Sequence, residues 1–169
     1  SECRYYTLNG YFSTSRDGQR IFDLYPYGGF SEYMTAPEYA LVNIPDNLSF
    51  EQAGRFGYLG TSYGALKNAS AGSGQVALID GITGTLGVAS TMLGLAMGLT
   101  RILGTGRDEH LLQRIKALAP DRIEVMRLGD GSVGDWAKSL TGGEGVDFVI
   151  SALGAKAPAS TMLDSMKGG

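Results

Sequence analysis

A chain of 169 residues can bury a hydrophobic core and form one full domain, with part of a second. Its net charge of −3 argues against nucleic acid or an anionic membrane surface as a partner. The single cysteine, Cys3, excludes an internal disulfide and indicates a reducing compartment, so we expect a cytoplasmic protein. The most apolar stretch, residues 88–103, is interrupted by Gly94, Gly98 and Arg101, which predicts no transmembrane helix.

The first 45 residues interleave polar and apolar side chains. Residues 29–35 alternate with a period of two, which predicts a half-buried strand. Residues 39–44 indicate a second strand before a Pro-Asp-Asn turn at 45–47. We therefore expect residues 1–45 to be the C-terminal part of a β-rich domain that is incomplete in this chain.

Helices are predicted next. Ser49 and Gln52 form a capping box, in which Ser is followed three residues later by Gln, so a helix is expected to open at this point. A further helical segment is predicted over residues 61–69. We assign residues 46–70 to interdomain helices.

From residue 75 the pattern changes to alternating strands and helices. Strands are predicted at residues 76–79, 100–104, 123–127 and 146–151. Helices are predicted at residues 84–97, 108–119 and 133–140, with a last helix before Lys167. This alternation with short links predicts an α/β fold in which a parallel sheet has helices on both faces.

Three glycines at three-residue spacing, Gly81, Gly84 and Gly87, lie between a strand-like run and a helix-like run. Gly81 and Gly84 allow a tight turn, and Gly84 also lets main-chain N–H groups approach a diphosphate. Gly87 lets the helix pack closely on the strand. An ordinary glycine turn is the alternative, which the strand–turn–helix context disfavours. We therefore expect a Rossmann-type dinucleotide-binding domain over residues 71–169.

The two ends of the chain indicate an internal fragment of a longer protein. The sequence begins with Ser1 rather than Met, and it stops at a Gly pair just after the last predicted helix. An α/β domain that stops there lacks its last strand or strands.

Four segments, in this order, resemble the medium-chain alcohol dehydrogenase and quinone reductase superfamily. They are YGGFSEYM at residues 27–34, LVNIPDNLS at 41–49, GTSYGAL at 60–66 and the glycine motif QVALIDGITGTLG at 75–87. The resemblance covers essentially the whole chain. It implies that a β-rich, chaperonin-10-like catalytic domain precedes the Rossmann-type domain.

The resemblance also implies the chemistry. Members transfer a hydride between a nicotinamide cofactor and an alcohol, aldehyde or ketone, or they reduce an enone or quinone. The main catalytic residues would lie upstream of Ser1, so we expect the fragment itself to be inactive. The full-length parent is expected to be a homo-oligomer that acts on a small molecule.

The coenzyme preference follows from the segment after the second strand of the Rossmann-type domain, where the family places an acidic residue in NAD enzymes. Gly106 stands there, which leaves room for a 2′-phosphate, and Arg107 offers a planar cation. Thr105 adds a hydroxyl donor, while Asp108 is expected to cap the next helix. These residues favour NADP over NAD; the alternative is that Arg107 is only a solvated residue at a helix start.

Further coenzyme contacts are expected at the glycine turn, at the domain junction and after the last strand. The family's matching Thr lies at the junction, and parallel strands present their carboxyl-end loops to the ligand. His110, the only histidine, is expected on a helix surface without a catalytic role. The predicted coenzyme-binding residues are Thr61, Thr83, Gly84, Thr85, Leu86, Gly87, Thr105, Gly106, Arg107, Ala152 and Leu153.

Zinc is left open for the parent, and residues 1–169 are predicted to hold no metal site. Gly57 falls where zinc-dependent members place a third ligand, and it has no ligand atom. Cys3 could match one cysteine of the family's structural-zinc lobe, and Glu51 could serve only after a register shift. Two alternatives therefore remain beside an NADP-dependent alcohol dehydrogenase: a zinc-free quinone or enone reductase, and a non-catalytic nucleotide-binding relative.

Overall fold

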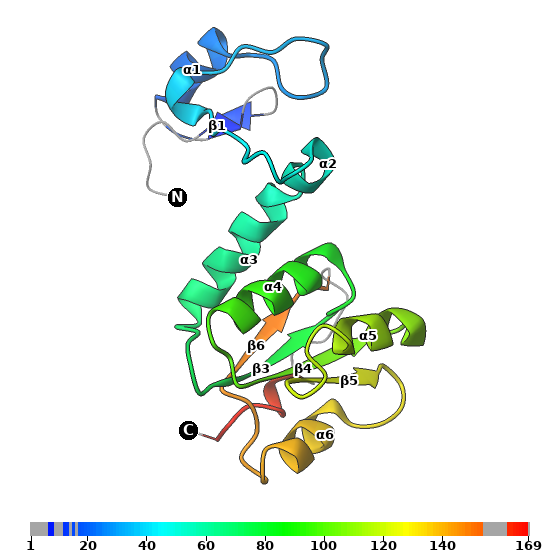
Figure 1. Ribbon diagram of the computed structural model, residues 1–169. Helices are drawn as coiled ribbons and strands as arrows, with labels where there is room; N and C mark the ends of the chain where they lie inside the picture. Colours follow the sequence, from blue (N-terminus) through cyan, green and yellow to red (C-terminus); the bar gives the residue numbers. More distant parts are fainter. Residues whose placement is uncertain (1–6, 9–11, 14, 16, 154–161, 169) are drawn as a thin grey trace. The chain divides into compact units, whose positions relative to one another are not determined.

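The computed structural model describes residues 7–8, 12–13, 15, 17–153 and 162–168 (Figure 1). The chain divides into two compact units, residues 1–49 and residues 50–169, and each is described by itself. The three-part division predicted from the sequence, with boundaries at 45 and 70, stays a prediction. Cys3 lies outside the described residues.

Unit 1 contains little regular structure among its described residues. Its elements are β1 (Thr7–Leu8), which pairs antiparallel with β2 (Phe12–Ser13), helix α1 (Gly18–Leu24) and the 3-10 helix η1 (Glu38–Ala40). The strands predicted at 29–35 and 39–44 are wrong. A period-two strand requires a paired neighbour and one buried face, but Phe30, Tyr33 and Val42 expose their side chains and neither segment joins a ladder in this structure.

Unit 2 is built around a four-stranded parallel sheet with the order β5-β4-β3-β6. The strands are β3 (Val76–Asp80), β4 (Arg101–Gly106), β5 (Ile123–Arg127) and β6 (Phe148–Ser151). The helices are α2 (Phe50–Ala53), α3 (Phe56–Asn68), α4 (Thr85–Ala96), α5 (Glu109–Lys116) and α6 (Val133–Leu140). The predicted α/β fold with a Rossmann-type parallel sheet is confirmed.

The sheet buries both of its faces because successive strand side chains point to opposite sides. On one face Ala77 and Ile79 of β3 pack with Leu66 of α3 and Leu112 of α5. On the other face Leu78 of β3 packs in a second cluster with residues of α6. Figure 1 shows α4 and α5 on one side of the sheet and α6 on the other.

Most predicted elements of unit 2 are present, with shifts at their ends. The strand at 123–127 and the helix at 133–140 have the predicted bounds. Helix α3 begins five residues before the predicted 61, and β4 continues two residues beyond the predicted 104. The last predicted helix is described only from Met162, where one helical turn lies; the preceding residues are outside the described part. Among the described residues, no helix is both long and apolar enough to span a bilayer.

Candidate functional site

The carboxyl ends of β3, β4 and β6 meet where the order of the sheet reverses. The chain runs outward from β3 through β4 to β5, and then crosses to place β6 on the opposite side of β3. Ligands of open parallel sheets bind outside the carboxyl ends of the strands at such a switch point. The glycine turn that follows β3 therefore lies at the edge where a ligand is expected.

The glycine turn is held by backbone hydrogen bonds and by the segment after β6. Gly81 has a φ of +78°, and its N–H and that of Ile82 both donate to the Thr105 carbonyl, at 3.0 and 2.9 Å. Leu153 lies over the turn, because a Cβ on Gly81 would come within 2.8 Å of Leu153 Cδ2. The Ala152 N–H donates to the Asp80 carbonyl at 2.9 Å, so the ends of β3 and β6 are joined.

The N-terminus of α4 opens at this turn without a side-chain cap. Gly84 is the N-cap residue, and the first turn contains no acidic side chain. Gly84 and Thr85 are exposed, whereas Leu86 is half-buried. The N–H groups of the first turn have no intrahelical acceptor and carry the positive end of the helix dipole. This arrangement can receive the oxygens of a diphosphate.

Gly87 is the position where α4 packs on the turn. A Cβ there would lie 2.6 Å from Ile82 Cα and closer still to the Gly81 carbonyl oxygen. Both are backbone atoms, so no rotamer change relieves the overlap. The packing role that the sequence predicted for Gly87 is confirmed.

At the end of β4, the three residues expected to bind the coenzyme, Thr105, Gly106 and Arg107, differ in burial and in contacts. Thr105 is fully buried, and its hydroxyl donates to Asp80 Oδ1 at 2.5 Å. The hydroxyl contact expected toward a phosphate stays a prediction. Gly106 is buried beside Thr83, whose Oγ1 would lie 3.3 Å from a Cβ at Gly106. Arg107 is exposed and has no ion-pair partner in the described part of the chain.

Asp108 caps α5, as predicted. Its Oδ1 accepts the Leu111 N–H at 3.0 Å, and Glu109 follows in the first turn. His110 is an exposed residue of the same helix, also as predicted.

Helix α3 lies against the start of α4. The Ser62 hydroxyl, which the sequence analysis did not single out, donates to the Leu86 carbonyl at 3.1 Å. Thr61 precedes it on the exposed side, and its hydroxyl donates to the Gly57 carbonyl at 3.2 Å within the helix. Thr61 adjoins Ser62, which contacts the start of α4, and the coenzyme contact of Thr61 stays a prediction.

Two further residues at this edge were not found from the sequence. Asp80 ends β3 fully buried, and its Oδ2 has no hydrogen-bond partner among the described residues. The only signal was an acidic residue closing an apolar run. Arg127 ends β5 directly opposite Gly106, and its Nε donates to the Arg107 carbonyl at 3.4 Å. No sequence signal could have found it, because the register of β4 with β5 is not written in either strand.

The metal predictions rest on residues that do not come together in the described part. Gly57 lies in α3 and Glu51 in α2, while Cys3 lies outside the described residues. Among the residues that the structure describes, no three His, Cys, Asp or Glu side chains are grouped to hold a metal ion. The predicted absence of a zinc site stays a prediction.

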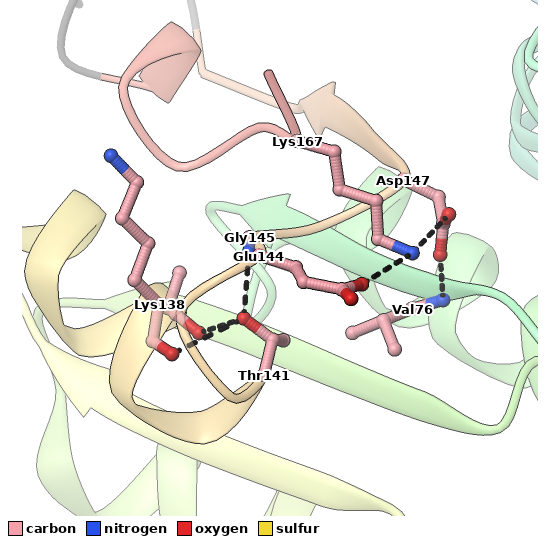
Figure 2. Close-up of polar contacts among 8 residues, drawn as sticks. Val76, Lys138, Thr141, Glu144, Gly145, Asp147 and Lys167 are labelled. Atoms are coloured by element: carbon pink, nitrogen blue, oxygen red, sulfur yellow. Dashed lines mark hydrogen bonds and ion pairs between the residues drawn. The ribbon is translucent and has the colours of Figure 1, made fainter. Parts of the chain in front are cut away.

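A cavity of about 260 Å³ lies at the amino ends of β3 and β4, opposite to the glycine turn, and an ion cluster lies beside it. Figure 2 shows Lys167 between Asp147 and Glu144, with Nζ–O distances of 2.9 and 3.6 Å. The other carboxylate oxygen of Asp147 accepts the Val76 N–H at 2.7 Å. These contacts fasten the residues after Met162 to the start of β3. The cavity lies far from the glycine turn along the strands, so we assign the cluster a structural role.

The Asp147 cluster makes stability depend on pH. Burial raises the pKa of Asp147, but the hydrogen bond from Val76 and the contacts with Lys167 outweigh it, so the pKa lies below the ordinary 3.8. A lowered carboxyl pKa stabilises the fold above the unfolded-state value, and this contribution is lost as the pH falls through the folded-state value. We expect Asp147→Asn to be less stable than wild type at pH 7 and the difference to shrink below about pH 4.

Urea unfolding of both proteins at pH 7 and at pH 3 measures this difference. Glu144→Gln is the matched control, because Glu144 is farther from Lys167 and the distances above place it outside the β3 contact. A stability difference for Asp147→Asn that is the same at both pH values would contradict the assignment.

The comparisons with known proteins agree with this geometry. No family model matches the sequence. A quinone oxidoreductase from Homo sapiens is 32% identical over 83% of this chain and 43% of its own length. An alcohol dehydrogenase from Geobacillus stearothermophilus is 36% identical over 69% of this chain and 34% of its own length. The chain therefore spans less than half the length of these relatives.

Solved structures give the same result. The quinone oxidoreductase from Thermus thermophilus, described with its NADPH complex, has a TM-score of 0.67 at 30% identity, over 83% of this chain and 45% of that one. An NAD-dependent alcohol dehydrogenase has a TM-score of 0.73 at 26% identity, over 83% of this chain and 40% of that one. Over the matched residues, these neighbours share the fold of this chain.

Proposed function

We propose that this chain, which belongs to the medium-chain alcohol dehydrogenase and quinone oxidoreductase superfamily, forms the coenzyme-binding part of an NADP(H)-dependent oxidoreductase. The observation that carries the proposal is the uncapped N-terminus of α4, which opens at a glycine turn on the switch point of the sheet. The whole protein would act on a small alcohol, aldehyde, ketone or quinone. The single cysteine supports the cytoplasm as its compartment, and the resemblance supports a homo-oligomer.

The residues at this edge fit a dinucleotide in a definite order. The first-turn N–H groups of α4 and the adjoining Thr83 would hold the diphosphate. Gly106, the last residue of β4, and Arg107, which follows it, would hold the adenosine end. Ala152 and Leu153, after β6, would lie toward the nicotinamide, with Thr61 on the side of α3. A bound nicotinamide supplies or accepts the hydride, and these residues bind and orient it.

NADP is proposed over NAD because of the charge at the end of β4. In an NAD enzyme this position carries an acidic residue that binds the ribose hydroxyls. Gly106 stands here instead, and the next residue is an exposed arginine whose side chain is not engaged in an ion pair among the described residues. A guanidinium in this place is suited to a 2′-phosphate, which it can bind with two hydrogen bonds.

Arg107→Ala is expected to weaken NADP binding by about one to two orders of magnitude, because a charge-assisted hydrogen bond contributes roughly 1.5–3 kcal/mol. NAD binding should change little. Titration of each coenzyme into the full-length protein measures both dissociation constants. Arg114→Ala removes the same charge from the far end of α5 and serves as the control. Equal losses for NADP and NAD in Arg107→Ala would mark the residue as structural.

A zinc-free quinone or enone reductase is the second candidate, favoured by Gly57 and by the quinone oxidoreductases among the relatives. The same preparation separates the candidates by its metal content and by NADPH oxidation with a quinone and with an aldehyde. Turnover of the quinone without bound zinc supports the second candidate. Turnover of the aldehyde with stoichiometric zinc supports an alcohol dehydrogenase. Coenzyme binding without turnover of either substrate would support a non-catalytic relative.

A further inference from the structure

A second arginine lies beside the expected 2′-phosphate position, on a different strand. Gly106 and Arg127 are partners in the register of β4 and β5, and the Leu128 N–H donates to the Gly106 carbonyl at 2.7 Å. The Arg127 side chain then turns toward the loop after β4, where its Nε donates to the Arg107 carbonyl at 3.4 Å. The two arginines are 20 residues apart in sequence, yet they share one loop.

Among the described residues, no hydrogen bond or ion pair joins the terminal nitrogens of Arg127 to the protein. Its Nε makes the contact to Arg107, and within the described ranges no carboxylate lies within ion-pair distance of either guanidinium. The nearest acid in sequence to Arg107, Asp108, directs Oδ1 to the Leu111 N–H. Both arginines are exposed, so their charges are available to an external ligand.

Arg127 contacts the Arg107 backbone, so the two cationic side chains extend from one small region, where a bound anion would offset their like charge. A phosphate monoester matches such a pair, because it carries close to two negative charges and three acceptor oxygens. Arginine supplies paired N–H donors in a plane, which suits phosphate oxygens better than a lysine ammonium does. The chemistry of the pair therefore selects a terminal phosphate over a neutral ribose.

We propose that Arg127 is a second specificity-determining residue, which binds the 2′-phosphate of NADP(H) together with Arg107. This inference rests on the proposed coenzyme function. Arg127 has two roles in it: Nε positions the loop after β4 through the Arg107 carbonyl, and the terminal nitrogens bind the phosphate.

Arg127→Gln separates the two roles, because the glutamine amide keeps an N–H donor but has no charge. The full-length protein is titrated with NADP, NAD, 2′,5′-ADP and 5′-AMP. We expect Arg127→Gln to weaken NADP and 2′,5′-ADP binding about tenfold, the equivalent of about 1.4 kcal/mol, and to leave NAD and 5′-AMP within about twofold. Arg114→Gln is the matched control and should change none of the four.

Three other outcomes would overturn the inference, and each has a different pattern of affinities. Equal weakening of NADP and NAD in Arg127→Gln would leave only the loop-positioning role. Unchanged NADP binding in Arg127→Gln, with a selective loss in Arg107→Ala, would overturn the role of Arg127 while the proposed coenzyme preference survives. A wild-type protein that binds 2′,5′-ADP no better than 5′-AMP would overturn both.

Discussion

Gly87→Ala is expected to destabilise unit 2 by about 3 kcal/mol, at the upper end of the range for overpacked positions. The added Cβ would overlap the backbone of Gly81 and Ile82, and neither can move without displacing the turn from β3. Urea unfolding followed by far-UV circular dichroism measures the loss.

Gly64→Ala is the matched control, because it makes the same change inside helix α3, where the new Cβ meets no atom within 4 Å apart from its chain neighbours and the helix's own backbone. Alanine favours a helix interior over glycine by about 0.8–1.0 kcal/mol, so this control is expected to stabilise the protein. Wild-type stability in Gly87→Ala would mean that α4 does not pack on the turn as described.

Gly84→Val is expected to weaken dinucleotide binding about a hundredfold while leaving the fold largely intact. Gly84 is exposed and has extended backbone angles, with φ −77° and ψ 167°, which valine also adopts. A Cβ there would lie 3.3 Å from the Gly81 carbonyl oxygen, so the turn must shift by a few tenths of an ångström. Its side chain would stand in front of the first-turn N–H groups of α4. Losing two charge-assisted hydrogen bonds costs about 3 kcal/mol or more, so the affinity for NADP and for NAD should both fall about a hundredfold.

Titration with both coenzymes and a parallel urea unfolding curve test this result. Gly72→Val, in the loop before β3 where a Cβ meets no atom within 4 Å apart from its chain neighbours, controls for adding a valine away from the proposed site. Unchanged coenzyme affinity in Gly84→Val would remove the main support for a coenzyme site at the N-terminus of α4.

The sequence predicted the sheet of unit 2 well because each strand there is a short apolar run between clear helix signals. The strand at 123–127 and the helix at 133–140 have the predicted bounds, the latter with Ser132 as its cap. Residues 29–35 and 39–44 carry an equally regular period, but a period alone does not supply the neighbouring strands that a ladder requires. These two segments are not strands because strand pairing depends on residues that are distant in the sequence.

The coenzyme edge was predicted in outline and missed in detail for a related reason. The strand was predicted to end at Gly104, two residues before its observed end. In the structure Gly104 is needed because Ile82 Cγ2 would lie 2.8 Å from a Cβ there, and Gly106 pairs with Arg127. The strand therefore continues to Gly106. As a result Thr105 is buried against Asp80, and the Arg127 side chain contacts the loop that follows β4.

The two strands that pair with the central strand β3, β4 and β6, are synthesised at very different times. β4 follows it after one helix, whereas Asp147, which precedes β6, is 71 residues from Val76. At 5–20 residues per second, translation leaves that edge of β3 open for roughly 4 to 14 s. An open edge exposes unpaired N–H and C=O groups to other chains. Until β6 arrives, this edge of β3 in the nascent chain is therefore open to pairing with another chain.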